Sequence, residues 1–143
     1  MPEDRNPFGD DLFGQTHVRA YRETGGEQGY TWRGNTILLL TTTGHRSGRQ
    51  RTTPLIFRED GERWVLVASK GGAPDHPDWY KNLAANPKAT IQVKRDQIPV
   101  RAHAAEGAER TRLWSLMTER WPHYDEYQRR TDREIPVVVL ERT

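Results

Sequence analysis

Short stretches of alternating or β-branched apolar residues recur along most of the chain and predict strands. Residues 98–105 place apolar side chains at every second position, the pattern of a strand with one buried face. The pair Asp60 and Gly61, between two such stretches, is a strong hairpin signal. The predicted strands are residues 36–43, 52–57, 64–69, 89–93, 98–105 and 135–140.

Apolar positions at helical spacing predict helices around these strands. The first is weakly amphipathic, covers residues 11–24 and follows a loose arm at residues 1–10. In the second helix we expect Asp75 as the N-cap and Pro77 in the first turn, with an end before residues 86–87. Two further helices are predicted at residues 107–121 and 123–131.

Short strands joined by hairpins, with few helices between them, favour a mainly β, α+β fold with flanking helices. The antiparallel sheet of six strands should close on itself as a barrel rather than form a βαβ array. A chain of 143 residues has room for one core, so we expect a single domain over residues 1–143.

Composition excludes several classes of protein. The chain has no cysteine, which rules out disulfides, thiolate metal sites and a cysteine nucleophile. Its longest apolar runs, residues 37–40 and 137–140, are far shorter than the roughly 20 residues of a membrane span. Residues 1–4 lack the basic start of a signal peptide. We therefore expect neither a membrane span nor a signal peptide, and a cytoplasmic protein.

The net charge of +2 is small but unevenly distributed. Residues 1–27 carry three basic and six acidic side chains, whereas residues 44–95 carry ten and five. The middle of the chain should therefore attract anions, although a merely solvated charged face is the alternative.

The loop at residues 44–51 combines glycines, the Ser47 hydroxyl and three guanidinium groups. Glycines allow backbone N–H groups to turn toward an oxyanion, and arginine gives forked hydrogen bonds to phosphate or carboxylate oxygens. The loop therefore suits phosphate, with a solvated hairpin loop as the alternative. The three arginines are Arg46, Arg49 and Arg51.

A second candidate segment follows the predicted strand 64–69, where glycines precede a helix. A helix start offers unpaired N–H groups to an anion or a carbonyl edge. Lys70, beside Gly71 and Gly72, adds a point charge where a ligand can approach the backbone closely. A simple sharp turn is the alternative.

Aromatic residues form two further candidates. Trp79 and Tyr80 lie in the first turns of the second helix, with core packing as the alternative, and Lys81 and Asn82 beside them are expected at the surface. Tyr124 and Tyr127 are three residues apart, so they share a helical face and could line a flat pocket with stacking surface and hydroxyl donors. Packing of both tyrosines against the barrel is the alternative.

Other familiar chemistries have little support. The five histidines show no close ligand spacing, so we expect no metal site. No nucleophile elbow, Walker loop or dinucleotide-binding glycine motif occurs. A Ser-His-Asp hydrolase stays open, because such triads assemble from distant positions.

Taken in order, these segments resemble the deazaflavin-dependent nitroreductase family, a branch of the flavin-binding split-barrel superfamily. The likeness covers about residues 36–141. Its motifs are LLLTTTGHRSG at 38–48, VASKGG at 67–72, HPDWYKNL at 76–83, NP at 86–87 and REIPV at 133–137. The resemblance implies a split β-barrel that binds coenzyme F420, a 5-deazaflavin with a phosphate and an oligoglutamate tail, and passes its hydride to a flat acceptor such as a quinone or a nitroaromatic compound.

The resemblance also assigns residues to the cofactor. Those implied to hold the phosphate and tail are Arg46, Ser47, Arg49 and Arg51. Those implied to meet the deazaflavin ring and its linker are Ser69, Lys70, Gly71 and Gly72. Those implied to close the ring site are Pro77, Trp79 and Tyr80.

On the acceptor side, Tyr124 and Tyr127 match the family's substrate tyrosines, and Ser69 is implied to hydrogen-bond the acceptor oxygen. One position departs from the family pattern. His45 stands where the family commonly has arginine or lysine, so one cation near the phosphate is missing whenever its imidazole is neutral.

Three alternatives stay open from sequence. The same fold could use FMN with a nicotinamide donor. A basic barrel could bind single-stranded nucleic acid through arginine and aromatic stacking, although the arginines cluster in one loop and the charge is almost balanced. The protein could also sense or store the cofactor, or work peripherally at the inner face of the cell membrane, where quinones reside. The oligomeric state is open.

Overall fold

The computed structural model describes residues 14–143. The predicted arm at residues 1–10 and the first three residues of the predicted helix 11–24 lie outside the described residues. No helix in residues 14–143 is long and apolar enough to cross a membrane.

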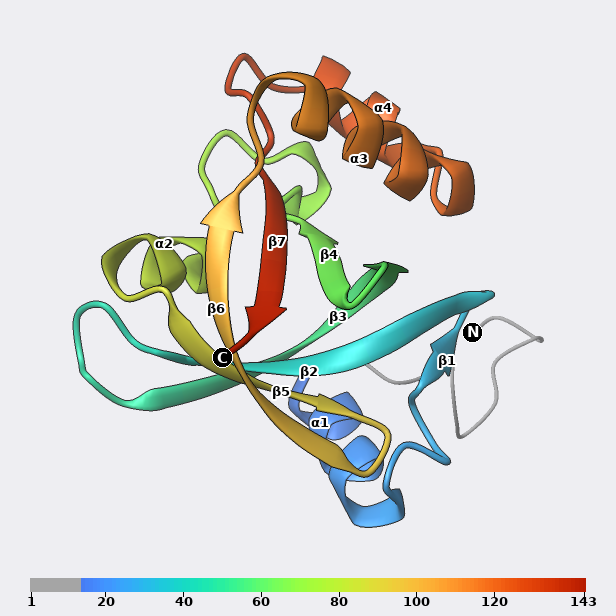
Figure 1. The fold of residues 1–143 in the computed structure, drawn as a ribbon, viewed down its shortest axis with the longest axis vertical. Coiled ribbons are helices and arrows are strands. Elements are labelled where there is room, and N and C mark those ends of the chain that lie inside the picture. The colour runs from blue at the N-terminus through green and yellow to red at the C-terminus, as the bar shows by residue number, and fades with distance from the viewer. Residues whose placement is uncertain (1–13) are drawn as a thin grey trace.

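The fold is a closed antiparallel β-barrel (Figure 1). Its strands run in the order β2, β3, β4, β7, β6, β5, and β5 pairs with β2 to close the ring. Their bounds are β2 Asn35–Thr43, β3 Gln50–Asp60, β4 Arg63–Val67, β5 Lys88–Val93, β6 Asp96–Ala104 and β7 Val137–Arg142. The predicted six-stranded antiparallel barrel is thus confirmed.

A seventh strand, β1 (Thr31–Trp32), pairs with the start of β2. It was not predicted, because two residues are too few to show a period. The predicted strand 64–69 also ends early, at Val67. Ser69 has right-handed helical angles of φ −79° and ψ −40°, and it leads into a short 3₁₀ turn at Lys70–Gly72. Ser69 therefore lies in a loop and not in the sheet.

Strand β2 explains how the barrel is covered. Leu38 and Leu40 face the barrel interior, whereas Ile37 and Leu39 pack against helix α1 (Gly14–Thr24) on the outside. A strand buried on both faces reads as a continuous apolar run rather than as an alternation, which accounts for the run at residues 37–40. Strand β2 therefore contributes to two clusters of the core, one inside the barrel and one beneath α1.

The remaining helices enclose the other side of the barrel. Helices α3 (Gly107–Arg120) and α4 (His123–Arg129) cover the outward valines of β4 and β7, at the end of the molecule opposite α1 (Figure 1). Helix α2 (Asp78–Ala85) links β4 to β5. The expectation that Asp75 caps α2 is wrong: Pro77 occupies the N-cap, and the Asp75 carboxylate lies between the ammonium groups of Lys70 and Lys81 at 3.4 and 3.5 Å.

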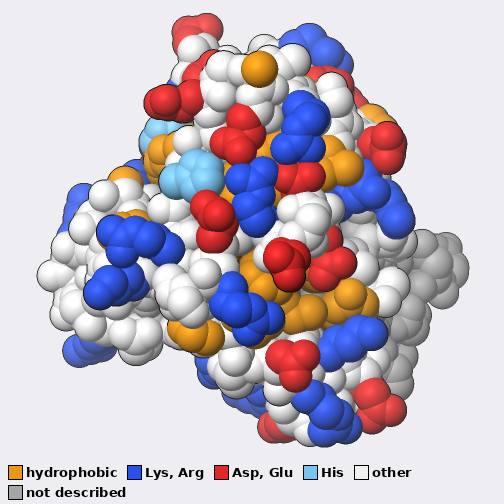
Figure 2. All heavy atoms as spheres, viewed as in Figure 1, with side chains coloured by type: hydrophobic (Ala, Val, Ile, Leu, Met, Phe, Trp, Pro, Cys, Tyr) orange, Lys and Arg blue, Asp and Glu red, His pale blue; other side chains and the backbone are white. Residues whose placement is uncertain are grey.

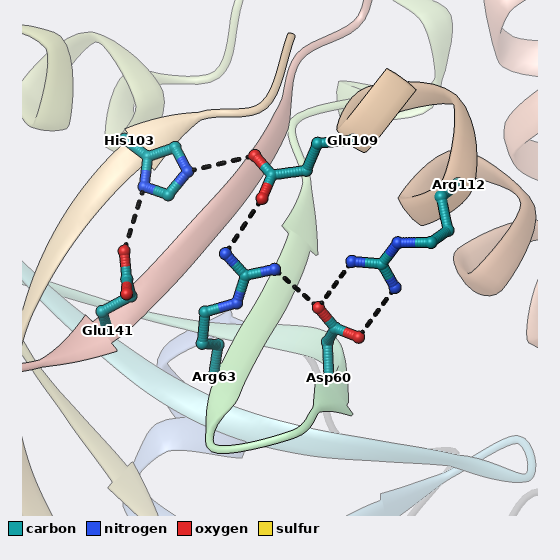
Figure 3. Close-up of polar contacts among 6 residues, drawn as sticks. All are labelled: Asp60, Arg63, His103, Glu109, Arg112 and Glu141. Atoms are coloured by element: carbon teal, nitrogen blue, oxygen red, sulfur yellow. Dashed lines mark hydrogen bonds and ion pairs between the residues drawn. The ribbon is translucent and has the colours of Figure 1, made fainter. Parts of the chain in front are cut away.

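Charged side chains of both signs are interspersed on the face shown in Figure 2. A chain of polar contacts among six side chains ties α3 to the barrel (Figure 3): Asp60, Arg63, His103, Glu109, Arg112 and Glu141. Asp60 accepts from Arg63 at 2.6 Å and from Arg112 at 2.9 Å, and Glu109 lies between Arg63 and His103. The Arg112 and Arg63 guanidinium groups hold the pKa of Asp60 well below its usual range. The ion pairs of Asp60 with Arg63 and Arg112 therefore persist at acidic pH and help to hold α3 on the barrel.

Helix α1 is fixed to the barrel by the fully buried hydroxyl of Tyr21. This hydroxyl accepts from the Lys94 N–H at 2.7 Å and lies 3.0 Å from the Ile37 carbonyl oxygen, to which it donates. We expect Tyr21→Phe to lower the free energy of unfolding by about 1–3 kcal/mol, because it leaves buried backbone groups unpaired. Denaturant unfolding of both proteins measures the difference.

We also expect the stability of the fold to depend on pH through Tyr21. Burial raises the pKa of Tyr21 from 10.0 to about 12, so the folded state keeps a proton that the unfolded state loses. The neutral Tyr21 hydroxyl stabilises the fold fully below pH 10. As the pH rises toward 12, the free energy of unfolding falls by roughly 3 kcal/mol at most. Tyr21→Phe should not show this loss; an equal loss in both proteins would assign it to other groups.

Candidate functional site

Two cavities adjoin on the outside of the barrel, and they differ in character. The polar cavity has a volume of about 760 Å³ and lies between α1, β3, α2 and the loop that joins β2 to β3. The apolar cavity, of about 480 Å³, lies between β3, the loop after β4 and helix α4. Thr53 and Trp79 line both cavities and so mark the junction. Both volumes are in the range of small-molecule sites.

The polar cavity is lined by cationic and hydrogen-bonding groups from four segments. Among its lining residues are Arg22, Arg46, Ser47, Arg51 and Lys81, and Asp78 is the one carboxylate that residues 14–143 contribute. Because the cations outnumber the carboxylate, the cavity attracts anions. The predicted anion site at residues 44–51 therefore coincides with a real concavity.

The loop at residues 44–51 is shaped by its own hydrogen bonds. Gly44 N–H donates to the Arg49 carbonyl at 2.7 Å, and Gly48 N–H donates to the Gly44 carbonyl at 2.9 Å. Ser47 Oγ accepts from the Arg49 N–H at 3.1 Å. These bonds hold the turn, while the side chain of Arg49 is exposed and is absent from the lining of both cavities.

Asn82 of α2 binds the loop at residues 44–51, and the prediction that it lies at the surface is wrong. Expected at the surface, it is instead 3% exposed. Its Oδ1 accepts from the His45 N–H at 2.9 Å and from His45 Nδ1 at 2.6 Å, and its Nδ2 donates to Thr42 Oγ1 at 3.0 Å. The bond fixes the Nδ1–H tautomer of His45 and leaves Nε2 for a ligand. Lys81 is half-buried, lines the polar cavity and pairs with Asp75.

The apolar cavity brings together three of the segments that sequence singled out. Ser69, Lys70 and Gly71 form one wall, Pro77 and Trp79 a second, and Tyr124 and Tyr127 a third. The rings of Tyr124 and Tyr127 lie 6.2 Å apart in an edge arrangement, which confirms that they share a face. Such walls of aromatic rings suit a flat ligand.

Two of the residues assigned to the ring site do not line the cavities. Gly72 is buried behind the apolar wall: an added Cβ would lie 2.7 Å from the Tyr127 carbonyl oxygen. The ring of Tyr80 packs on His76 at 4.7 Å and belongs to the barrel core. Both support the site from behind.

Burial in the apolar cavity favours the neutral form of the Tyr124 phenol. Burial raises the pKa of Tyr124, with a smaller contribution from Tyr127, so the Tyr124 hydroxyl stays protonated at neutral pH. Trp121 Nε1 donates to the Tyr127 hydroxyl oxygen at 3.4 Å, which leaves the Tyr127 hydrogen able to donate to a ligand. The cavity thus offers O–H donors without negative charge.

Several lining residues were not singled out from the sequence. In the polar cavity they are Gln15, Arg22, Thr52 and Thr53, and in the apolar cavity His17, Trp32, Pro54, Leu55, Ile56 and Trp121. Arg22 donates to Thr52 Oγ1 at 2.9 Å, which ties α1 to β3 beside the polar cavity. No local motif marks these residues, because the closing of the sheet brings them together.

Comparison with known proteins agrees with this geometry. A sequence profile of the F420H(2)-dependent quinone reductase family matches residues 13–142. An F420H(2)-dependent quinone reductase of Mycobacterium tuberculosis is 42% identical over 130 residues, which cover 88% of this chain and 87% of the relative. The chain belongs to the F420H(2)-dependent quinone reductase family.

Experimental structures agree with membership of the F420H(2)-dependent quinone reductase family. An F420-H2 dependent reductase, FDR-A, is 46% identical with a TM-score of 0.68, and the match covers 73% of this chain and 93% of that one. A second structure, described as a domain-swapped dimer, is 41% identical with a TM-score of 0.71 over 89% and 95% of the two chains. As a family member, the protein is an oxidoreductase that uses coenzyme F420 to reduce a quinone.

The residues present fit the cofactor of the F420H(2)-dependent quinone reductases. The phosphate and oligoglutamate tail are anionic, and the polar cavity supplies Arg22, Arg46, Arg51 and Lys81. A deazaflavin ring is flat and largely apolar, and the adjoining cavity supplies aromatic walls. The two cavities meet at Trp79, as one ligand with two such ends requires.

Proposed function

We propose that the polar cavity holds the phosphate and oligoglutamate tail of F420, and that the apolar cavity holds its deazaflavin ring together with the acceptor, a quinone or a nitro compound. The observation that carries this proposal is the junction at Thr53 and Trp79 between a cationic cavity and an aromatic one. When bound, the reduced cofactor supplies the hydride. The chain itself supplies position, charge and protons.

On the tail side, Arg46 and Arg51 form charge-assisted hydrogen bonds to phosphate and carboxylate oxygens, with Ser47 as a further donor. His45 contributes Nε2 to this set, and the imidazole adds a positive charge only when it is protonated. These contacts bind the anionic end and fix the depth at which the ring enters the apolar cavity.

On the ring side, Ser69, Lys70 and Gly71 contact the deazaflavin and its linker, and Pro77 and Trp79 close the site. The acceptor would lie against Tyr124 and Tyr127, beside the ring that supplies the hydride. The Tyr127 hydroxyl and the Ser69 hydroxyl donate to the acceptor oxygen, where negative charge develops. The aromatic walls exclude water from the reacting atoms.

The direct test is a fluorescence titration with F420 beside FMN, followed by oxidation of F420H2 with menadione as acceptor. We expect F420 to bind, FMN to bind weakly by comparison, and oxidation to depend on menadione. Binding of FMN in preference to F420, or of neither, would contradict the proposal.

Replacing Lys70 by alanine should raise the Kd for F420 about tenfold, because one ammonium group at the ring linker is lost. Arg46→Ala should raise it by a similar factor, and both effects should shrink at high salt, since Arg46 and Lys70 are exposed cations. The exposed Arg129 on α4 gives a matched control, Arg129→Ala. Normal F420 binding by Lys70→Ala would show that the ring and linker assignment is wrong.

A further inference from the structure

Arg133 lies in the segment between α4 and β7 and does not line either cavity. Its guanidinium nevertheless contacts the ring-site loop at several points. Nη2 donates to the Ser69 carbonyl at 2.7 Å, Nε donates to the Ala73 carbonyl at 2.9 Å, and Nη1 donates to the Ala68 carbonyl at 3.2 Å. One half-buried side chain therefore holds both ends of the loop at residues 68–73 from behind.

His76 completes this arrangement. Arginine can only donate, so the 3.0 Å contact between Arg133 Nη1 and His76 Nδ1 requires an unprotonated Nδ1. Burial, the Arg133 charge and the Lys81 charge lower the pKa of His76, against the opposing effect of Asp75, which keeps the ring neutral. His76 also packs on Tyr80, so Arg133 is oriented by the segment that leads into α2.

The loop needs such support because of its backbone. Lys70, Gly71 and Gly72 have φ values of 47°, 63° and 84°, and Lys70 is not a glycine. A side-chain-bearing residue in this left-handed region is strained by about 1–2 kcal/mol and persists only where its surroundings fix it. Hydrogen bonds from a charged donor to the carbonyls on either side of the turn provide that constraint.

The direction of the peptide groups follows from these bonds. In a trans peptide the C=O and N–H point in opposite directions. The Ala68 and Ser69 carbonyls point at Arg133, so the N–H groups of Ser69 and Lys70 point away from it. Ser69 and Lys70 line the apolar cavity on their other side, and a right-handed residue followed by a left-handed one makes neighbouring N–H groups converge.

We propose that Arg133 is a positioning residue for cofactor binding: it holds the carbonyl side of the loop at residues 68–73 so that the Ser69 and Lys70 N–H groups face the deazaflavin ring. This inference rests on the proposed function of the apolar cavity. Arg133 acts through the loop and makes no contact with the cofactor itself.

The experiment compares the F420 Kd of wild type with those of Arg133→Gln, Arg133→Lys and the control Arg129→Gln. We expect Arg133→Gln to raise the Kd about tenfold to a hundredfold, Arg133→Lys to recover part of this affinity, and Arg129→Gln to match wild type. The KM for menadione should rise by a smaller factor than the Kd for F420, because Ser69 is the one residue of this loop assigned to the acceptor. If Arg133→Gln does not fold, Arg133→Lys carries the test, with a smaller increase in Kd.

A double-mutant cycle separates positioning from a general loss of structure. Arg133→Gln and Lys70→Ala should be strongly non-additive, because both act through one loop, whereas Arg133→Gln and Arg51→Ala should be additive. Additivity with both partners, or an unchanged Kd in a folded Arg133→Gln protein, would overturn the proposal.

Amide hydrogen exchange in the protein without cofactor gives an independent readout. Arg133→Gln should speed exchange at residues 69–73 and leave the barrel strands unchanged, and unchanged exchange in the loop would overturn the inference. Failure of wild type to bind F420 would instead refute the proposed function, and the exchange result would still decide whether Arg133 orders the loop.

Discussion

Replacing Gly72 by alanine is expected to lower the free energy of unfolding by about 2–5 kcal/mol and to reduce quinone reductase activity severely. Gly72 has φ +84°, and its added Cβ would lie 2.7 Å from the Tyr127 carbonyl oxygen and 3.1 Å from Tyr127 Cα. Left-handed strain contributes about 1–2 kcal/mol and overpacking about 1–3 kcal/mol. Since the obstacle is backbone, α4 must move away from the loop and carry Tyr127 with it.

Gly71→Ala is the matched control. Gly71 also has a positive φ, of 63°, but an added Cβ there would have no atom within 4 Å. The free energy of unfolding of Gly71→Ala should therefore fall only by the cost of the left-handed backbone, about 1–2 kcal/mol. Unfolding midpoints of both variants make the comparison. Equal losses would show that the close approach of Gly72 to α4 adds nothing to the left-handed strain.

The second large effect is expected for Asn82→Leu. Leucine has a similar size but cannot accept from His45 N–H and Nδ1 or donate to Thr42 Oγ1. Leaving the buried Thr42 hydroxyl unpaired costs about 1–3 kcal/mol, and each lost bond from the exposed His45 costs about 0.5–1.5 kcal/mol, so we expect a loss of about 2–6 kcal/mol. The loop at residues 44–51 also loses its anchor to α2, which should raise the Kd for F420 about tenfold or more.

Thr42→Val distinguishes these contributions. Valine leaves both bonds from His45 to Asn82 Oδ1 in place and removes only the partner of Asn82 Nδ2, so its F420 affinity should stay closer to wild type than that of Asn82→Leu. Thermal unfolding and F420 titration of both variants provide the data. Equal F420 affinities in the two variants would mean that the His45 bonds do not position the tail loop.

The strands could be predicted because one-sided burial and tight turns give short, local patterns in the sequence. The Asp60-Gly61 turn sits where β3 and β4 join, with Asp60 opposite Arg63, and the period-two pattern at residues 98–105 marks β6. By contrast, β1 is two residues long and shows no period. The error at Asp75 has a physical cause: two nearby ammonium groups compete for its carboxylate with the helix start.

The candidate site was predictable where glycine, arginine and aromatic residues cluster in sequence. The two cavities are lined by residues 44–47, 50 and 51, by residues 69–71 and by the tyrosines of α4, whereas Arg49 lies outside both. Asn82 was misplaced because an asparagine in a helix is usually solvated, and only the fold reveals that its side chain reaches His45. Likewise Arg22 and Arg133 act on segments distant in sequence, so their partners cannot be inferred from spacing.

A crystal structure of the protein with oxidised F420 would test the proposed use of the two cavities most directly. We expect the deazaflavin ring in the apolar cavity beside Ser69–Gly71 and Trp79, with the phosphate and glutamates in the polar cavity near Arg46 and Arg51. We also expect space for the acceptor against Tyr127. A ring bound in the polar cavity, or a tail directed away from Arg46 and Arg51, would contradict the proposal.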